Sequence, residues 1–129
     1  MRTQSTPRVQ AYEVNVRGRD WGQIEHAISP GKAKAIYFQQ VRDAWEYVKF
    51  TDLTCRVIGD PVTSPRFALC AEYRGFKGLK VGTRCDVGGE LGTIVGHNDS
   101  ANFAVLFDAT SKHQGHTLNV HPDSLKLLA

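Results

Sequence analysis

The segment Pro61-Val62-Thr63-Ser64-Pro65, near the middle of the 129-residue chain, most limits the folds open to it. Two prolines within five residues hold the backbone extended and keep it out of the interior of a sheet, because proline has no N–H to donate. The chain is therefore expected to divide here into two half-sized units. We assign residues 1–8 to a flexible tail, 9–60 to a first unit, 61–78 to a linker with a connecting strand, and 79–129 to a second unit.

The first unit is expected to be a β–α–β unit. Residues 12–16 alternate apolar and polar side chains, which is typical of a strand, and residues 53–57 repeat that pattern. Residues 21–28 are expected to form a turn or a short helix. Ser29 and Pro30 are typical of a helix start, and the helix expected over residues 30–48 has a broad apolar face: Ala33, Ile36, Tyr37, Val41, Ala44, Trp45 and Val48.

The sequence pattern of the second unit differs from that of the first, because glycines separate short apolar runs. A strand is expected over residues 67–73, ahead of this unit. From Leu79 onward, strands are expected over residues 81–87, 90–96, 102–107, 116–120 and 125–128. Short strands at such a spacing indicate a small barrel. The predicted fold class is therefore α+β, with a β–α–β unit that carries one long amphipathic helix, followed by a β-barrel.

Three stretches of the second unit resemble the SH3-like barrels of the KOW type. They are Val81-Gly82-Thr83-Arg84-Cys85-Asp86-Val87, Glu90-Leu91-Gly92-Thr93-Ile94-Val95-Gly96 and Asn102-Phe103-Ala104-Val105-Leu106-Phe107-Asp108. Gly92 matches the glycine that lets the second strand of such barrels coil sharply. The resemblance implies an SH3-like barrel over residues 79–129, and such barrels bind RNA, DNA, ribosomal parts, RNA polymerase or peptides. The first unit is loosely similar to small domains of uncertain role found in bacteriophage genomes.

The composition limits the cellular setting. No run of about 18 apolar residues is present, and the first ten residues are polar, so we expect neither a membrane-spanning helix nor a secretory signal. The three cysteines, Cys55, Cys70 and Cys85, are odd in number and evenly spaced, which favours reduced thiols in the cytoplasm. We expect them to be buried as small apolar side chains.

The densest positive stretch is the main candidate site. Residues 66–84 hold five basic side chains and one carboxylate, a local charge of +4 in a chain whose net charge is +3. Cations with interleaved aromatic rings are typical of nucleic-acid sites, where they displace counterions and stack bases. The alternative is a polar connector whose aromatic rings fill a core between the two units. The candidate nucleic-acid-binding residues are Arg66, Tyr73, Arg74, Phe76, Lys77, Lys80 and Arg84, joined by Arg17 and Arg19 after the first strand.

The sequence carries no known catalytic motif, and we expect no cofactor and no metal. His113 and His116 have an HxxH spacing with His121 nearby, but a glycine-containing loop does not fix that geometry as a helix does. The leading hypothesis is a non-catalytic regulatory protein, phage-encoded, that acts on nucleic acid or on a host complex that handles nucleic acid. The alternatives are a protein-interaction module, such as an inhibitor of a host defence or transcription factor, and a small metal-dependent or cysteine enzyme.

Overall fold

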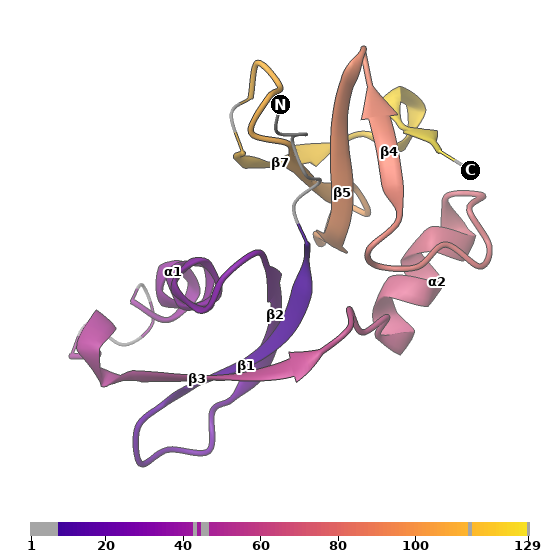
Figure 1. Ribbon diagram of the computed structural model, residues 1–129. Coiled ribbons are helices and arrows are strands. Elements are labelled where there is room, and N and C mark those ends of the chain that lie inside the picture. The colour runs from indigo at the N-terminus through magenta and orange to yellow at the C-terminus, as the bar shows by residue number, and fades with distance from the viewer. Residues whose placement is uncertain (1–7, 43, 45–46, 114, 129) are drawn as a thin grey trace. The chain divides into compact units, whose positions relative to one another are not determined.

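The computed structural model describes residues 8–42, 44, 47–113 and 115–128 (Figure 1). These residues form a mixed α+β protein with two α-helices and two β-sheets. The chain divides into two compact units: a first unit, Arg8–Pro61, and a second unit that holds the described residues from Val62 onward. Of the expected tail, residues 1–8, the first seven lie outside the described residues. Within the described ranges, no helix is both long and apolar enough to cross a membrane.

The first unit contains a three-stranded antiparallel sheet. Its strands are β1 (Gln10–Val16), β2 (Gln23–Ala27) and β3 (Leu53–Gly59), in the order β2-β1-β3. In the register, Val14 of β1 lies between Gln23 of β2 and Cys55 of β3. The alternation of β1 directs Tyr12, Val14 and Val16 to one face, where all three are buried.

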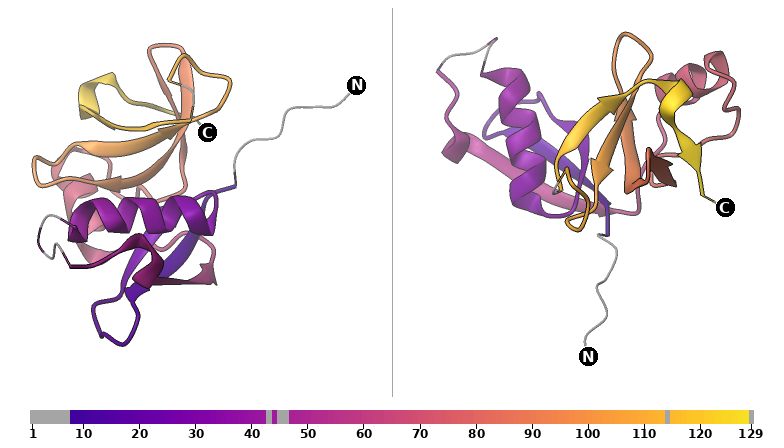
Figure 2. Two further views of the ribbon diagram at one scale, coloured as in Figure 1. Left: turned by 90° about the vertical axis from the view of Figure 1, so that its left-hand side faces the viewer. Right: turned by 90° about the horizontal axis from the view of Figure 1, so that it is seen from above.

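Helix α1 (Pro30–Val41) covers that face of the sheet (Figure 2). The expected helix start is confirmed: the Ser29 hydroxyl accepts a hydrogen bond from the Lys32 N–H at 3.2 Å, and Pro30 occupies the first turn. Ala33, Tyr37 and Val41 recur at a spacing of four residues and are buried against the sheet. A 3₁₀ turn, η1 (Phe50–Asp52), leads into β3.

Two expectations for the first unit are corrected. Residues 23–27 form strand β2 rather than a turn or a short helix, because all five residues pair with β1 and this pairing outweighs a local helical spacing. The helix ends at Val41 instead of continuing to residue 48. The Ala44 N–H donates to the Val41 carbonyl at 3.1 Å, a three-residue spacing that tightens and ends the helix. Trp45, expected on the apolar face, lies outside the described residues.

The second unit contains a five-stranded antiparallel sheet. The strands are β4 (Arg84–Val87), β5 (Glu90–His97), β6 (Phe103–Phe107), β7 (Thr117–Val120) and β8 (Lys126–Leu127), in the order β7-β6-β5-β4-β8. A 3₁₀ turn, η2 (Pro122–Ser124), precedes β8. The sheet is not closed into a barrel, because no ladder joins β7 to β8 in the described residues. The expected closure is corrected: β8 is two residues long, and among the described strands its one partner is β4.

The connecting strand expected over residues 67–73 is a helix, α2 (Pro65–Tyr73). The Ser64 hydroxyl accepts from the Phe67 N–H at 3.1 Å, and Pro65 occupies the first turn. Phe67, Cys70 and Ala71 are buried, and this three-and-four spacing is that of a helix face rather than of a strand. The second proline of the linker therefore starts a helix and does not extend the chain.

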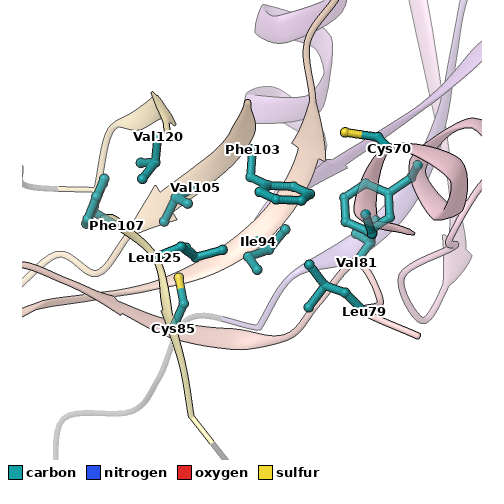
Figure 3. Close-up of a cluster of buried hydrophobic side chains, with 12 residues drawn as sticks. Cys70, Leu79, Val81, Cys85, Ile94, Phe103, Val105, Phe107, Val120 and Leu125 are labelled. Carbon is teal, nitrogen blue, oxygen red and sulfur yellow. The ribbon is translucent and has the colours of Figure 1, made fainter. Parts of the chain in front are cut away.

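Helix α2 contributes to the core of the second unit. Phe67, Cys70 and Ala71 join side chains from the sheet and from the segment before β4 in one cluster (Figure 3). The Phe67 and Phe103 rings lie 5.7 Å apart between centroids. The remaining buried members of the cluster are Leu79, Val81, Cys85, Ile94, Val105, Phe107, Val120 and Leu125. Because α2 packs on the sheet, it presents a fixed outer face to solvent.

Candidate functional site

The structure places seven of the nine candidate nucleic-acid-binding residues in the second unit. They lie on α2, in the segment that follows it, and at the start of β4: Arg66, Tyr73, Arg74, Phe76, Lys77, Lys80 and Arg84. Arg17 and Arg19 belong to the first unit, where they follow β1. The Arg19 guanidinium lies 4.9 Å from the centroid of the Trp21 ring. The candidate site is therefore built from the second unit.

Arg84 is a structural cation and not a surface contact. Its Nη1 and Nη2 atoms donate to the two carboxylate oxygens of Asp108 at 2.7 and 2.6 Å, and Nη1 also donates to the Thr93 hydroxyl at 3.0 Å. The hydrogen bonds to Asp108 raise the pKa of Arg84. Because its charge is paired with Asp108 and mostly buried, Arg84 is less available to a phosphate than an exposed cation, and we leave it out of the surface defined below.

Arg74 and Phe76 also serve the fold. The Arg74 guanidinium donates to the carbonyl oxygens of Ala101 and Ser100, both at 3.0 Å, and so holds the turn between β5 and β6 against α2. The Phe76 ring is partly buried and meets Phe103 edge to face at 5.8 Å. Phe76 therefore packs against the core of the second unit.

Four of the seven candidates in the second unit are exposed, and we call them the α2 surface: Arg66, Tyr73, Lys77 and Lys80. No described acidic side chain lies within ion-pair distance of the three cations. Tyr73 is 78% exposed, and the Arg74 guanidinium lies 5.6 Å from its ring centroid. The α2 surface thus combines unpaired positive charge with an exposed aromatic ring at the end of a packed helix.

A small cleft adjoins the α2 surface and was not foreseen from the sequence. It lies between α2 and the turn from β5 to β6, has a volume of about 250 Å³, and is lined by Arg66, Leu69, Cys70, His97, Asn98, Asp99 and Ala101. Leu69 is 68% exposed although it is apolar. Had residues 65–73 been taken as a helix, the spacing of Arg66, Leu69 and Tyr73 would have placed them on one helix face.

The three cysteines carry free thiols. Burial raises the pKa of Cys55 and of Cys70, and it raises the pKa of Cys85 to about 11. The Cys85 thiol donates to the Gly92 carbonyl at 3.7 Å. A thiol is nucleophilic only as the thiolate, so all three are poor nucleophiles at neutral pH.

The histidines are used by the fold in different ways. The His113 ring packs on Phe107 with centroids 4.5 Å apart, and His121 Nδ1 accepts from the Asp123 N–H at 3.1 Å at the start of η2. Among the described residues, no group of three or more His, Cys, Asp or Glu side chains is arranged to hold a metal ion.

A buried carboxylate lies under α1 in the first unit. Glu25 is only 8% exposed and accepts a hydrogen bond from the Gln23 amide, whose Nε2 also donates to Gln40 at 2.5 Å. Burial raises the pKa of Glu25, and the hydrogen bond from Gln23 lowers it by less. The charged form is therefore less stable in the folded unit than in the unfolded chain.

Replacing Glu25 with glutamine is expected to stabilise the first unit at pH 7. A raised folded-state pKa gives stability that is present at acid pH and is lost as the pH rises through the folded pKa, and the amide has no such loss. We expect the free energy of unfolding of the variant to exceed that of wild type by on the order of 1 kcal/mol at pH 7, which raises the Tm by a few degrees. This difference in stability is expected to shrink toward pH 4. Asp20→Asn, at an exposed turn, is the control and is expected to show no such trend. A variant less stable than wild type at pH 7 would contradict this account.

A scan against protein-family models found no match to this chain, and searches of curated proteins and of solved structures found none either.

Proposed function

We propose that this chain is a non-catalytic regulatory protein that binds single-stranded nucleic acid through the α2 surface. The observation that carries the proposal is Tyr73, a ring 78% exposed on a packed helix and accompanied by three unpaired cations. Sites for single strands combine a positive surface that follows the backbone with aromatic rings on which bases stack. The α2 surface offers both within one short stretch of chain.

Tyr73 is suited to stacking because its surroundings limit its motion. The Arg74 guanidinium lies against the ring, and two backbone carbonyls of the β5–β6 turn hold that guanidinium in place. A ring held on one side loses less rotational freedom when a base stacks on it than a free ring does. Arg74 therefore supports the site as a positioning residue rather than as a phosphate contact.

The three cations of the α2 surface supply the electrostatic part of the proposal. Arg66, Lys77 and Lys80 are exposed and have no acidic partner among the described residues, and Glu72 is the one carboxylate of the stretch. Each phosphate that these side chains neutralise releases condensed counterions, which favours binding and makes it salt-dependent. With Arg74 and Arg84 engaged in the fold, the charge available to a ligand is smaller than the +4 of the sequence stretch.

The arrangement of the second unit supports assigning it to the SH3-like folds of the KOW type as part of the same proposal. Four strands follow one another as a meander, and η2 then returns the chain so that β8 pairs with β4. This return of the chain to the first strand of the unit supports the assignment. Barrels of this kind include binders of RNA and DNA, which agrees with a binding role.

A protein partner is the second candidate function, and Leu69 is the observation that favours it. This side chain is 68% exposed next to Tyr73 on the same face of α2, and an exposed apolar side chain beside an exposed aromatic ring suits a protein interface, where aromatic residues are enriched. The unpaired cations of the α2 surface favour a nucleic-acid ligand over a protein partner. The raised pKa values of the three thiols support a binding role over a cysteine enzyme.

Replacing Tyr73 with alanine is expected to weaken binding to single-stranded DNA by about tenfold, since stacking on one aromatic ring contributes roughly 1–3 kcal/mol per base. The measurement is fluorescence anisotropy of a labelled mixed-sequence strand at low salt. Tyr73→Phe keeps the ring and is expected to bind within about twofold of wild type. Both substitutions are on an exposed side chain, so their unfolding curves are expected to match that of wild type within about 0.5 kcal/mol.

The same titration separates the two candidate functions. If wild type binds neither single-stranded nor double-stranded nucleic acid at low salt, the proposal is wrong. A partner retained in a nuclease-treated pull-down and lost with Leu69→Ala would then assign the α2 surface to a protein. Equal binding by wild type and Tyr73→Ala would show that a different surface is used.

A further inference from the structure

The cleft beside the α2 surface has the size and composition of a subsite for a small flat group. Its volume of about 250 Å³ is below the roughly 300–1,000 Å³ of pockets that enclose drug-sized ligands. Leu69, Cys70 and Ala101 supply apolar atoms, and Arg66 is shared with the α2 surface. A strand stacked on Tyr73 would pass this cleft, because Leu69 and Tyr73 are one helical turn apart.

The wall of the cleft opposite α2 is held in place by its own hydrogen bonds. Asn98 Oδ1 accepts from the N–H groups of Ser100 and Asn102 at 2.9 and 3.0 Å. The Ala101 N–H donates to the Asn98 carbonyl at 3.0 Å, and Ala101 has the left-handed φ of 59° that this turn requires. Arg74 fixes the same turn from the side of α2. The turn is thus ordered before any ligand binds.

Two polar groups of this wall form no hydrogen bond with any described residue. The Asp99 carboxylate is exposed and forms no hydrogen bond or ion pair with any described residue. Because Asn98 Oδ1 is engaged by two N–H donors, the amide orientation is set, and its Nδ2 donates to no described residue. The wall therefore offers one strong acceptor next to one donor.

We propose that this cleft receives one unpaired base and favours cytosine and adenine, whose exocyclic amino group neighbours a ring acceptor, over thymine and uracil, which carry no exocyclic amino group. Asp99 would accept from the amino group, as carboxylates do from cytosine N4, and the Asn98 amide would donate to the neighbouring ring nitrogen. Thymine and uracil present a carbonyl oxygen where the amino group would be, and that oxygen repels the carboxylate. This inference rests on the proposed function and adds to it a preference among bases.

The test is anisotropy at fixed low salt with labelled strands of cytosine, adenine or thymine alone, each about 12 nucleotides long. Wild type is expected to bind the cytosine and adenine strands about fivefold or more tighter than the thymine strand. Asp99→Asn places a donor where the carboxylate was, so this preference is expected to disappear while binding of the thymine strand is kept or improved. Asp123→Asn removes the same charge at an exposed position in η2, and it is expected to keep the preference.

The outcomes distinguish this inference from the function on which it rests. No binding to any strand would overturn both. Salt-dependent binding of all three strands with equal affinity would leave the proposed function standing and overturn the base preference. A preference that survives Asp99→Asn, or that Asp123→Asn removes equally, would show that Asp99 does not contact the base, and would overturn the assignment of the cleft.

Discussion

Gly92→Ala is expected to destabilise the second unit by about 3 kcal/mol, the upper end of what overpacking a core costs. Gly92 lies in the middle of β5, paired with Cys85 of β4 and Phe107 of β6. A Cβ atom at this position would lie 2.6 Å from Val105 Cγ1 and 2.9 Å from the Leu106 carbonyl oxygen. The second contact is backbone of the neighbouring strand, so the clash cannot be relieved by a change of rotamer. We expect a fall in Tm of more than about 10 °C.

Gly96→Ala is the matched control for this prediction. Gly96 lies on the same strand, a Cβ atom there would meet no described residue beyond its chain neighbours within 4 Å, and its φ is not positive. The Tm of Gly92→Ala is expected to lie below that of Gly96→Ala by most of the fall predicted for Gly92→Ala. Equal Tm values for the two variants would show that the strands separate freely at Gly92, which contradicts the packing described for the second unit. The sequence resemblance singled out Gly92 for coiling of the strand, whereas the structure gives the close approach of β6 as the reason.

Asp108→Ala is expected to destabilise the second unit by about 3 kcal/mol, since it leaves the charge of Arg84 without a partner in a mostly buried position. The two side chains are 26% and 12% exposed, and their two short hydrogen bonds are charge-assisted. The effect is read from urea unfolding midpoints. Adding Arg84→Met to Asp108→Ala is expected to recover part of the loss, because the double variant buries no unpaired charge.

The ion pair between Arg56 and Glu13 in the first unit is the control for this second prediction. Arg56 Nη2 lies 2.8 Å from Glu13 Oε1, a distance similar to that in the Arg84–Asp108 pair, but the two side chains are 70% and 45% exposed. Glu13→Ala is therefore expected to cost no more than about 1 kcal/mol. If Asp108→Ala costs as little as Glu13→Ala, the Arg84–Asp108 pair is solvated in solution, and Arg84 is then free to bind a phosphate.

Local sequence signals predicted α1 but not α2, although both helices begin in the same way. Ser29-Pro30 and Ser64-Pro65 each place a capping hydroxyl before a proline in the first turn. The first is followed by a long helical spacing, and the second by only nine residues between two linkers, so its apolar spacing is too short to separate a helix from a strand. The capping pair was the better signal, since it acts through the first turn alone. Strand β2 was not predicted because Trp21, Ile24 and Ile28 have a helical spacing, whereas the pairing with β1 that makes this segment a strand is not visible within the segment itself.

The candidate site was predicted in part for the same reason. Charge density along residues 66–84 is a local property, and it led to Arg66, Lys77 and Lys80. The partner of Arg84 is Asp108, and the carbonyls that bind Arg74 belong to residues 100 and 101. Both interactions join residues far apart in the sequence, so local sequence patterns do not reveal them. The cleft also needs α2 and the β5–β6 turn to meet, which only the packed unit brings about.

The most direct test of the central claim is the salt dependence of binding between the wild-type chain and a labelled single strand. If the three cations of the α2 surface each neutralise one phosphate, the logarithm of the association constant is expected to fall with the logarithm of salt concentration with a slope of about −2. Lys77→Glu with Lys80→Glu is expected to weaken binding and flatten that slope, whereas Lys32→Glu with Lys126→Glu changes the net charge equally and leaves both nearly as in wild type. A complex whose affinity does not change with salt, or no complex at low salt, would contradict the account.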